Sequence, residues 1–499
     1  MLPAVVAFSA CAPERGGGDG RFYASLGEAG GSDASDATRH AAPGGRVFRS
    51  NDELPGPHPR EGVAGADLHL TLEEAIRHAL ENNRSLLNRQ LDRELEGLSL
   101  DVAGDRWRPR FVIEPSLAWD SPGGEVALHA GMTLRLRTGG TLDRGWRGAL
   151  SDGLRDGTAI QALGISQPLL KGAGAEMEAA PVRRALIENR IQFLALRRAL
   201  ADVVVEVVDS YRAVIAASRQ VEIAEESLSR ARDQLDATRS LIRAGRVAER
   251  EAGRSEAVVA NREIGLVRAR SRLEAASARL VDTLDPGEMV MVHPRGELAV
   301  ADGQGLAAPE LEDVLLGRTD FRQAVLMVEA ARIDLAVARN TLLPDLSLRL
   351  ELSRDAEGRS DTAVRLGVAI PLNDREPRVE YVRARNGLLK AERNVTELRE
   401  SIRAALRQAL NEVEAGLLLA GMAGDARALA ERNLAVEEAK FGQGLSSTFE
   451  VGAAEGELVR AEQAEADAIL ALLAAQTRLD RISGRTLERW GIRLKEDAR

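Results

Sequence analysis

The residue types that most often carry catalysis or bind metals lack the spacing that such chemistry requires. No HExxH or comparable metal-ligand spacing occurs among the six histidines, which are His40, His58, His69, His78, His129 and His293. The chain contains neither the GxSxG of a nucleophile elbow nor a phosphate-binding P-loop. The sequence therefore predicts no enzyme, no metal site and no cofactor.

One glycine-rich turn invites a nucleotide-binding interpretation. Gly172-Ala173-Gly174 lies between an expected strand and an expected helix, as the dinucleotide fingerprint does. Met177 stands where the third glycine of that fingerprint belongs, and no alternation of strands and helices follows. We interpret the segment as a tight turn from a strand into a helix.

The composition favours long helices. The 499 residues are 44% apolar and 29% charged but only 3% aromatic, which suits thin, closely packed helices better than a thick globular core. The formal net charge of −10 argues against a primary nucleic-acid role, which would need a basic face. The single cysteine, Cys11, excludes an intramolecular disulfide.

Residues 1–67 are predicted to be a leader and a flexible linker. The apolar start ends at Phe8-Ser9-Ala10-Cys11, and small residues before a cysteine are what a bacterial lipoprotein signal needs. Cys11 is therefore a candidate for lipidation, and an ordinary apolar tail with an inert cysteine is the alternative. The remaining segment is rich in glycine and proline clusters.

The rest of the chain contains two copies of one plan. The first copy is expected at 68–285 and the second at 309–490, with a linker at 286–308 and a tail at 491–499. Each copy is predicted to hold an amphipathic helix, two strands, a very long helix, a turn and a return helix. The first copy opens with the capping-box pattern Thr71-Leu72-Glu73-Glu74.

Prolines mark the strands in both copies. The first strand follows Pro109 or Pro344, and the second ends at a matched phrase containing Pro168 or Pro371, because proline lacks the N–H that pairing requires. This pattern predicts four strands per chain. Four strands leave two open edges, and such edges pair with other chains. We therefore expect an oligomer.

Apolar residues at seven-residue spacing predict a coiled-coil seam in the first long helix. The positions are Leu186, Phe193, Leu200, Val207, Val214, Val221, Leu228, Leu235 and Ile242. The seam ends at Ala244-Gly245, where glycine suits a left-handed cap. In the second copy the apolar spacing over Val395–Leu417 averages about 3.67, which removes a left-handed supercoil.

This order of elements resembles the TolC-type outer-membrane efflux proteins over nearly all of residues 68–490. The matching features are Leu70–Ile76 with Leu80–Asn83, the prolines before the strands, and Ser166–Gly174. The resemblance implies a mainly α fold with a small β part and an internal duplication. It also implies a homotrimer, in which long antiparallel coiled-coil helices form an α-barrel and four strands per chain build a twelve-stranded β-barrel.

The function that the resemblance implies is a passive exit duct of a tripartite efflux or type I secretion system. The duct would sit in the outer membrane of a Gram-negative bacterium and extend into the periplasm. Its implied partners are outer-membrane lipid, a periplasmic adaptor (membrane fusion) protein and, through the adaptor, an inner-membrane pump of RND or ABC type. No nucleic-acid partner is implied.

The resemblance also places the adaptor-docking tips. In the second copy, Gly444, Leu445 and Ser446 match the family's turn, and in the first copy Gly245, Arg246 and Val247 align with it. Arg246 replaces the family's leucine, so docking is expected to depend more on the second copy. The resemblance makes Glu450 and Glu251 candidates for acids that line the channel.

Two other classes of protein compete with the duct. An elongated coiled-coil scaffold without a pore explains the heptads but not the proline-bounded strands that occur in both copies. A periplasmic adaptor has a helical hairpin too, but only one, without duplication. A trimer in outer-membrane fractions would favour the duct, and a soluble elongated dimer would favour the scaffold.

Overall fold

The computed structural model describes residues 68–120, 123–149, 160–284, 292–295, 309–355 and 358–494, with short strands at 21–22, 24–26 and 48–49. Cys11 lies outside the described residues, so its lipidation stays a prediction. The helices are α1 (Leu72–Asn82), α2 (Arg84–Gly104), η1 (Asp105–Trp107), α3 (Ala175–Arg243), α4 (Arg250–Leu284), α5 (Leu311–Gly317), α6 (Thr319–Asn340), α7 (Glu376–Gly442), α8 (Thr448–Ser483) and α9 (Thr486–Arg489).

Within the described residues, six strands form one antiparallel sheet, and six shorter strands form three pairs. The sheet strands are β5 (Arg110–Asp120), β6 (Gly123–Arg135), β7 (Thr141–Ala149), β8 (Ile160–Pro168), β10 (Asp345–Arg354) and β11 (Ser360–Ala369). The shorter strands are β1 (Arg21–Phe22), β2 (Ala24–Leu26), β3 (Phe48–Arg49), β4 (Leu68–Leu70), β9 (Val292–Pro294) and β12 (Ile492–Leu494). Among these, β1 pairs with β3, β2 with β12 and β4 with β9.

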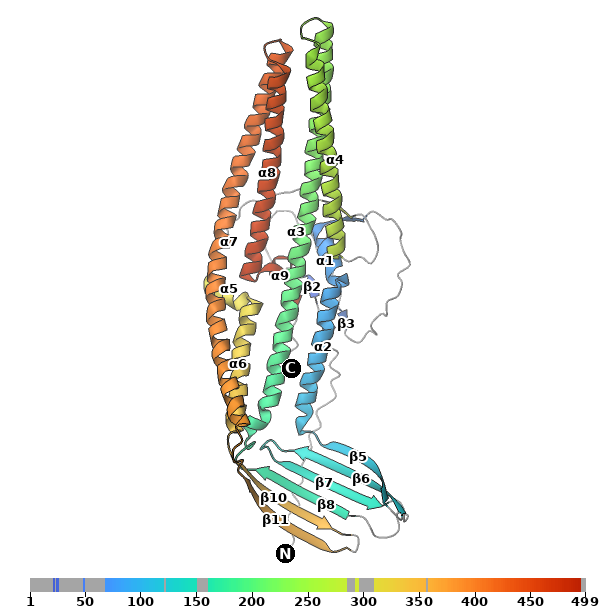
Figure 1. Cartoon of the computed structure of the whole chain (residues 1–499), viewed down its shortest axis with the longest axis vertical. Coiled ribbons are helices and arrows are strands. Elements are labelled where there is room, and N and C mark those ends of the chain that lie inside the picture. The colour runs from blue at the N-terminus through green and yellow to red at the C-terminus, as the bar shows by residue number, and fades with distance from the viewer. Residues whose placement is uncertain are drawn as a thin grey trace, which may run out of the picture.

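The chain is elongated, with the sheet at one end and two helical tips at the other (Figure 1). Two long helices, α3 and α7, run from the sheet to the tips. Toward the tips α3 packs on α4 and α8, and α8 packs on α7; toward the sheet, α3 packs on α2 and α6, and α6 packs on α7. The helices therefore form a wall one helix thick, with four helices side by side at either level.

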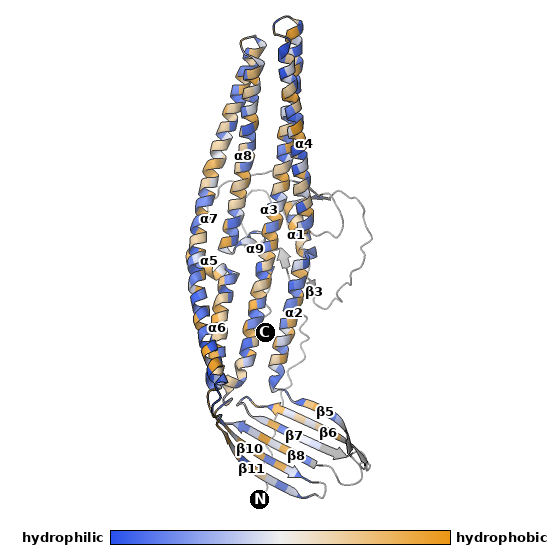
Figure 2. Ribbon diagram, in the orientation of Figure 1, coloured by the Kyte–Doolittle hydropathy of each residue, from blue (hydrophilic) through white to orange (hydrophobic). Residues whose placement is uncertain are grey.

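Six of the nine seam positions predicted for the first long helix are buried in α3, whereas Leu186 is 37% exposed and Val221 and Ile242 are partly buried. Phe193, Leu200, Val207, Val214, Leu228 and Leu235 are all buried. The flanks stay polar, and Figure 2 shows polar and apolar residues interleaved along every long helix. Among the described residues, no helix combines the length and apolarity needed to cross a membrane.

Local signals read from the sequence are confirmed at the helix ends. Thr71 and Glu74 form a capping box, in which the Thr71 N–H donates to Glu74 Oε2 at 2.8 Å and the Glu74 N–H donates to Thr71 Oγ1 at 3.4 Å. Strands β5 and β10 begin directly after Pro109 and Pro344. The mainly helical fold with a small sheet is thus confirmed.

The predicted number of strands is wrong, because the sheet has six strands rather than four. Its order is β11-β10-β8-β7-β6-β5. The two additional strands, β6 and β7, lie between the two strands that were predicted for the first copy. The signal was present, since Val126, Leu128, Ala130, Met132 and Leu134 alternate with other residues as a strand requires.

Gly444, two residues after the end of α7, is required by backbone conformation. Gly444 has φ of 77°, and a Cβ added there would meet no atom within 4 Å, so its substitution carries only a conformational cost. We expect Gly444→Ala to destabilise the folded chain by about 1 kcal/mol, because non-glycine residues disfavour the left-handed region. Chemical unfolding in detergent, followed by circular dichroism, measures the change.

Gly421→Ala is the matched control for this prediction. Gly421 is an exposed glycine inside α7, also with nothing within 4 Å of an added Cβ, but without a positive φ. There alanine should stabilise the helix by roughly 0.5–1 kcal/mol, because it restricts the unfolded chain. Equal effects at the two positions would contradict the conformational explanation.

Candidate functional site at the helical tips

The two tip turns share one backbone geometry. Gly245 follows α3 with φ of 69°, and the Arg246 N–H donates to the Leu241 carbonyl at 3.0 Å. Gly444 follows α7 in the same conformation, and the Leu445 N–H donates to the Lys440 carbonyl at 2.8 Å. Both turns satisfy helix-terminal carbonyls through a left-handed glycine, which is the Schellman arrangement. Each turn then leads into a helix that returns toward the sheet.

The two tips present different chemistry to solvent. On the second tip, Leu445 is 75% exposed and Phe449 is 73% exposed, so two large apolar side chains are exposed to solvent in the single chain. On the first tip, Arg246 is exposed and Val247 is partly covered. Sequence reasoning singled out Leu445 but missed Phe449, although its position one residue into α8 could have indicated an exposed first turn.

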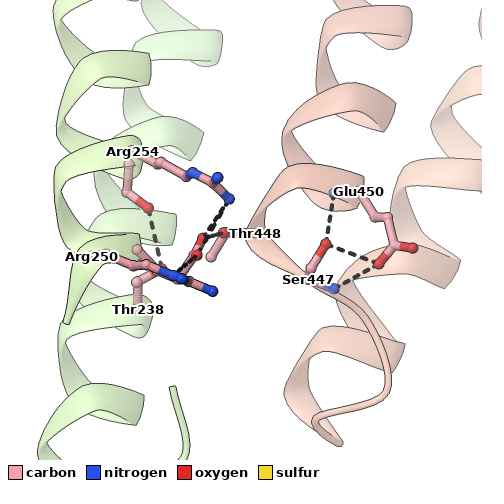
Figure 3. A network of polar contacts seen from close by, with 8 residues as sticks. Thr238, Arg250, Arg254, Ser447, Thr448 and Glu450 are labelled. Atoms are coloured by element: carbon pink, nitrogen blue, oxygen red, sulfur yellow. Dashed lines mark hydrogen bonds and ion pairs between the residues drawn. The ribbon is translucent and has the colours of Figure 1, made fainter. Parts of the chain in front are cut away.

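Glu450 caps its own helix. Its Oε2 accepts hydrogen bonds from the Ser447 N–H at 2.7 Å and from Ser447 Oγ at 3.1 Å (Figure 3). It also accepts one from Ser446 Oγ at 3.0 Å. In return the Glu450 N–H donates to Ser447 Oγ at 3.3 Å. The hydrogen bond from the Ser447 backbone is the main reason that the pKa of Glu450 is lowered. The side chain is therefore ionised and held at the start of α8.

A second acid links the two tips. Glu251 in the first turn of α4 accepts a hydrogen bond from Thr448 Oγ1, at the start of α8, at 2.8 Å (Figure 3). Arg254 Nη1 and Arg250 Nε lie 3.3 Å and 3.6 Å from Glu251 Oε1. The Thr448 hydrogen bond and then the two arginines lower the pKa of Glu251. The structure thus brings the two tips together through Glu251 and Thr448, a contact that sequence reasoning did not predict.

A buried charged cluster lies farther down the same helix contact. Glu455 and Glu462 of α8 are 5% and 8% exposed, and Arg230 of α3 lies between them at 3.8 Å and 3.9 Å. Ser227 Oγ donates to Glu455 Oε1 at 3.1 Å. Two Arg230 nitrogens and one Glu462 oxygen are buried without a hydrogen-bond partner among the described residues. Burial is the main cause that raises the pKa of Glu462.

These groups form contacts between helices rather than a reaction centre. Within the described ranges, no group of three or more His, Cys, Asp or Glu side chains could hold a metal ion. Each perturbed tip acid bonds to a helix-start hydroxyl, an arginine or a lysine. What this arrangement provides is a pair of tips joined by polar contacts, one of which exposes an apolar surface.

Comparison with known proteins shows which proteins have a similar fold. The family model for outer membrane efflux proteins matches residues 311–485. No curated protein sequence matches the chain. The open state of the Neisseria gonorrhoeae MtrE outer membrane channel superposes with a TM-score of 0.65 at 17% identity, over 83% of this chain and 89% of that chain.

Two further solved structures agree with this fold. Vibrio cholerae VceC, an outer membrane protein, matches with a TM-score of 0.63 at 15% identity, over 83% of this chain and 96% of that chain. The Campylobacter jejuni CmeC outer membrane channel matches with a TM-score of 0.60 at 15% identity, over 85% and 87%. The resemblance predicted from the sequence is confirmed at two levels: residues 311–485 match the outer membrane efflux protein family, and the chain as a whole has the fold of these outer membrane channels.

The buried acid predicts a pH dependence of stability. The pKa of Glu462 is raised in the folded chain, so the native state holds a proton that the unfolded state releases near its ordinary value of 4.5. Stability therefore falls as pH rises from about 4.5 through the raised pKa. Glu462→Gln should remove this dependence, and the melting temperature of the variant relative to the native protein should rise between pH 4 and pH 8.

Glu457→Gln, an exposed position on the same helix, is the matched control. Thermal melts of the detergent-solubilised protein across this pH range measure both variants. A constant difference between Glu462→Gln and the native protein would show that Glu462 ionises without cost in the assembled protein.

Proposed function

We propose that three copies of the chain assemble into a passive exit duct of a tripartite efflux or type I secretion system. The sheet lies in the outer membrane, the helices form a tunnel through the periplasm, and the tips meet an adaptor that connects the duct to an inner-membrane pump of RND or ABC type. The chain itself carries out no catalysis. The energy for export comes from the pump.

The observation that carries this proposal is the wall-like shape of the chain. Helices form a layer one helix thick, and the sheet continues that layer at one end (Figure 1). Both edge strands of the sheet, β5 and β11, lack a partner on one side among the described residues. A thin curved wall with two open edges closes when copies of it join around an axis. A pore-free scaffold would have no use for the open sheet.

The second tip is the stronger docking surface for an adaptor. Leu445 and Phe449 gain from leaving water, because burying apolar surface is favourable. Arg246 on the first tip would lose hydration of its guanidinium unless the adaptor supplied a carboxylate. We therefore assign the main adaptor contact to Gly444, Leu445 and Ser446, with Gly245, Arg246 and Val247 as the secondary contact.

Leu445→Asp should abolish export and leave the trimer intact. A carboxylate at this exposed position disturbs no packing inside the chain, but it would have to be desolvated on docking. Export by cells carrying the variant measures function, and light scattering in detergent measures the assembly. Arg246→Ala is the control variant on the other tip and should keep most of the export.

The docking surface and the trimeric duct can each be contradicted by a separate outcome. Native export by a Leu445→Asp trimer would remove the docking surface from the second tip. A stable monomer or dimer as the sole species of the native protein would remove the duct itself.

Glu450 and Glu251 are proposed to line the closed end of the channel. Three copies would place three of each carboxylate around the axis, where they attract cations. Glu450→Gln isolates the charge, because glutamine also serves in a capping box. We expect this variant to show weaker cation selectivity and weaker block by divalent cations in planar bilayers. Unchanged selectivity would place Glu450 on the outer wall, as a cap only.

A further inference from the structure

The sheet has one apolar face and one polar face, and the hairpin of β6 and β7 follows the same alternation. One row of paired residues crosses five strands and is apolar throughout; it comprises Leu134, Leu142, Ile165, Leu350 and Val364. The adjacent row, on the opposite face, is polar or small; it comprises Arg110, Thr133, Asp143, Gly164, Glu351 and Ala363. The added strands are thus in phase with the others in these two rows, and Arg144 of β7 is a charged exception on the apolar face.

This alternation is the pattern of a strand with lipid on one face and water on the other. On the apolar face, Val364, Leu366 and Val368 are 68%, 65% and 62% exposed. On the polar face, Arg365 Nη1 donates to Glu351 Oε2 at 2.6 Å, and His129 lies 3.8 Å from Glu114 on the added part of the sheet. The strand lengths also fit, because a membrane-spanning strand needs about 9–11 residues. If the β6–β7 hairpin lay outside the membrane, its apolar residues would not need to lie on the same face as those of the other strands.

We infer that β6 and β7 are wall strands, so that three copies close an eighteen-stranded barrel through a seam between β5 of one copy and β11 of the next. This inference rests on the proposed trimer. Neighbouring strands within the sheet are all antiparallel, and the number of strands per chain is even. The two edge strands therefore run in opposite directions, and rotation about a common axis makes the seam antiparallel as well.

Six strands also match the width of the helical wall beneath them. At the sheet end, α2, α3, α6 and α7 stand side by side, and four helices at 8–10 Å spacing span about 36 Å. Six strands at 4.8 Å spacing and a tilt of about 40° span about 38 Å of circumference, whereas four strands span about 25 Å. At this tilt, six strands per chain continue the tunnel without narrowing it.

The consequence concerns the size of the cargo. Because barrel diameter grows roughly linearly with the number of strands, eighteen strands give a barrel about 1.5 times as wide as twelve at the same tilt. The barrel interior takes the polar face, which carries Glu114, His129, Glu351 and Arg365. We assign the duct to hydrophilic cargo that is wider than a twelve-stranded barrel of this tilt would pass.

Disulfide cross-linking in native membranes tests the strand order. In a Cys11→Ser background, cysteines at 112 and 131, which are direct partners in β5 and β6, should join within one chain. Cysteine at 112 combined with cysteine at 162, 164 or 166 of β8 should not join. The reverse result would mean that β5 pairs with β8 and that the added hairpin lies off the wall, which overturns the inference.

A second set of cysteines tests the trimer independently. Cysteine at 112 combined with cysteine at 363, 367 or 369 of β11 should give cross-linked dimers and trimers in at least one combination. Absence of all of them, with only monomeric mass in detergent, would contradict the proposed trimer. Correct pairing within the chain could still be observed in that case, so the two failures are distinguishable.

A variant that lacks β6 and β7 tests whether these strands widen the barrel. Residues 121–159 are replaced by a second copy of Asp355–Arg359, the turn between β10 and β11, which joins β5 to β8 and keeps the up-and-down order. In planar bilayers, the largest neutral polymer that enters from the extracellular side should be about one third smaller in radius than for the native duct. An unchanged polymer cut-off in a trimeric deletion variant would overturn the inference.

Discussion

The apolar seam of α3 is the contact from which most other elements take their position. Helices α1, α2, α4, α6 and α8 all pack against α3. Its middle section forms the largest buried cluster among the described residues, together with residues of α1, α2, α4, α9 and β12. Tyr211 in this cluster lies 2.9 Å from the carbonyl oxygens of both Leu70 and Arg295, and so ties the start of the first repeat and the connector between repeats to one helix.

In a single chain, a wall of this kind leaves apolar side chains exposed and strand edges unpaired. Each long helix buries one stripe only, and the sheet leaves the outer sides of β5 and β11 unpaired among the described residues. Large apolar side chains along α2 and α7 stay exposed in the single chain, among them Leu95, Leu98, Leu418 and Met422. In the proposed trimer, assembly around an axis would cover such stripes and pair the edges in one step. The same geometry that leaves the single chain incomplete would then create the tunnel.

The charged groups along this wall differ in how far they are exposed to solvent and in how well their charge is stabilised. At the tips, Glu450 and Glu251 hold their charge because N–H, hydroxyl or guanidinium groups stabilise it. Between α3 and α8, Glu462 is buried, and its burial outweighs the attraction of Arg230 and the other nearby arginines, so the charge is costly there. The contact between the two hairpins therefore includes hydrogen-bonded charges at the tip and an incompletely hydrogen-bonded buried charge below it.

The sequence by itself determined whatever depends on neighbours along the chain. The seam of α3, the left-handed Gly245 and the prolines before β5 and β10 follow from local periodicity and backbone limits. The Ser447-x-x-Glu450 capping box also follows local rules, although the resemblance suggested a channel acid at Glu450 instead. The turn at Gly444 was placed by the family resemblance, and docking at either turn stays a proposal.

Tertiary structure alone decided the features that join distant segments. Glu251 meets Thr448 across 197 positions of sequence, and no local pattern specifies that pair. The added strands alternate correctly, but a short alternating segment could equally have formed an external hairpin. Only its register against β5 and β8 makes it part of the wall. Pairing between strands depends on partners elsewhere in the chain, so the width of the sheet is a property of the folded molecule.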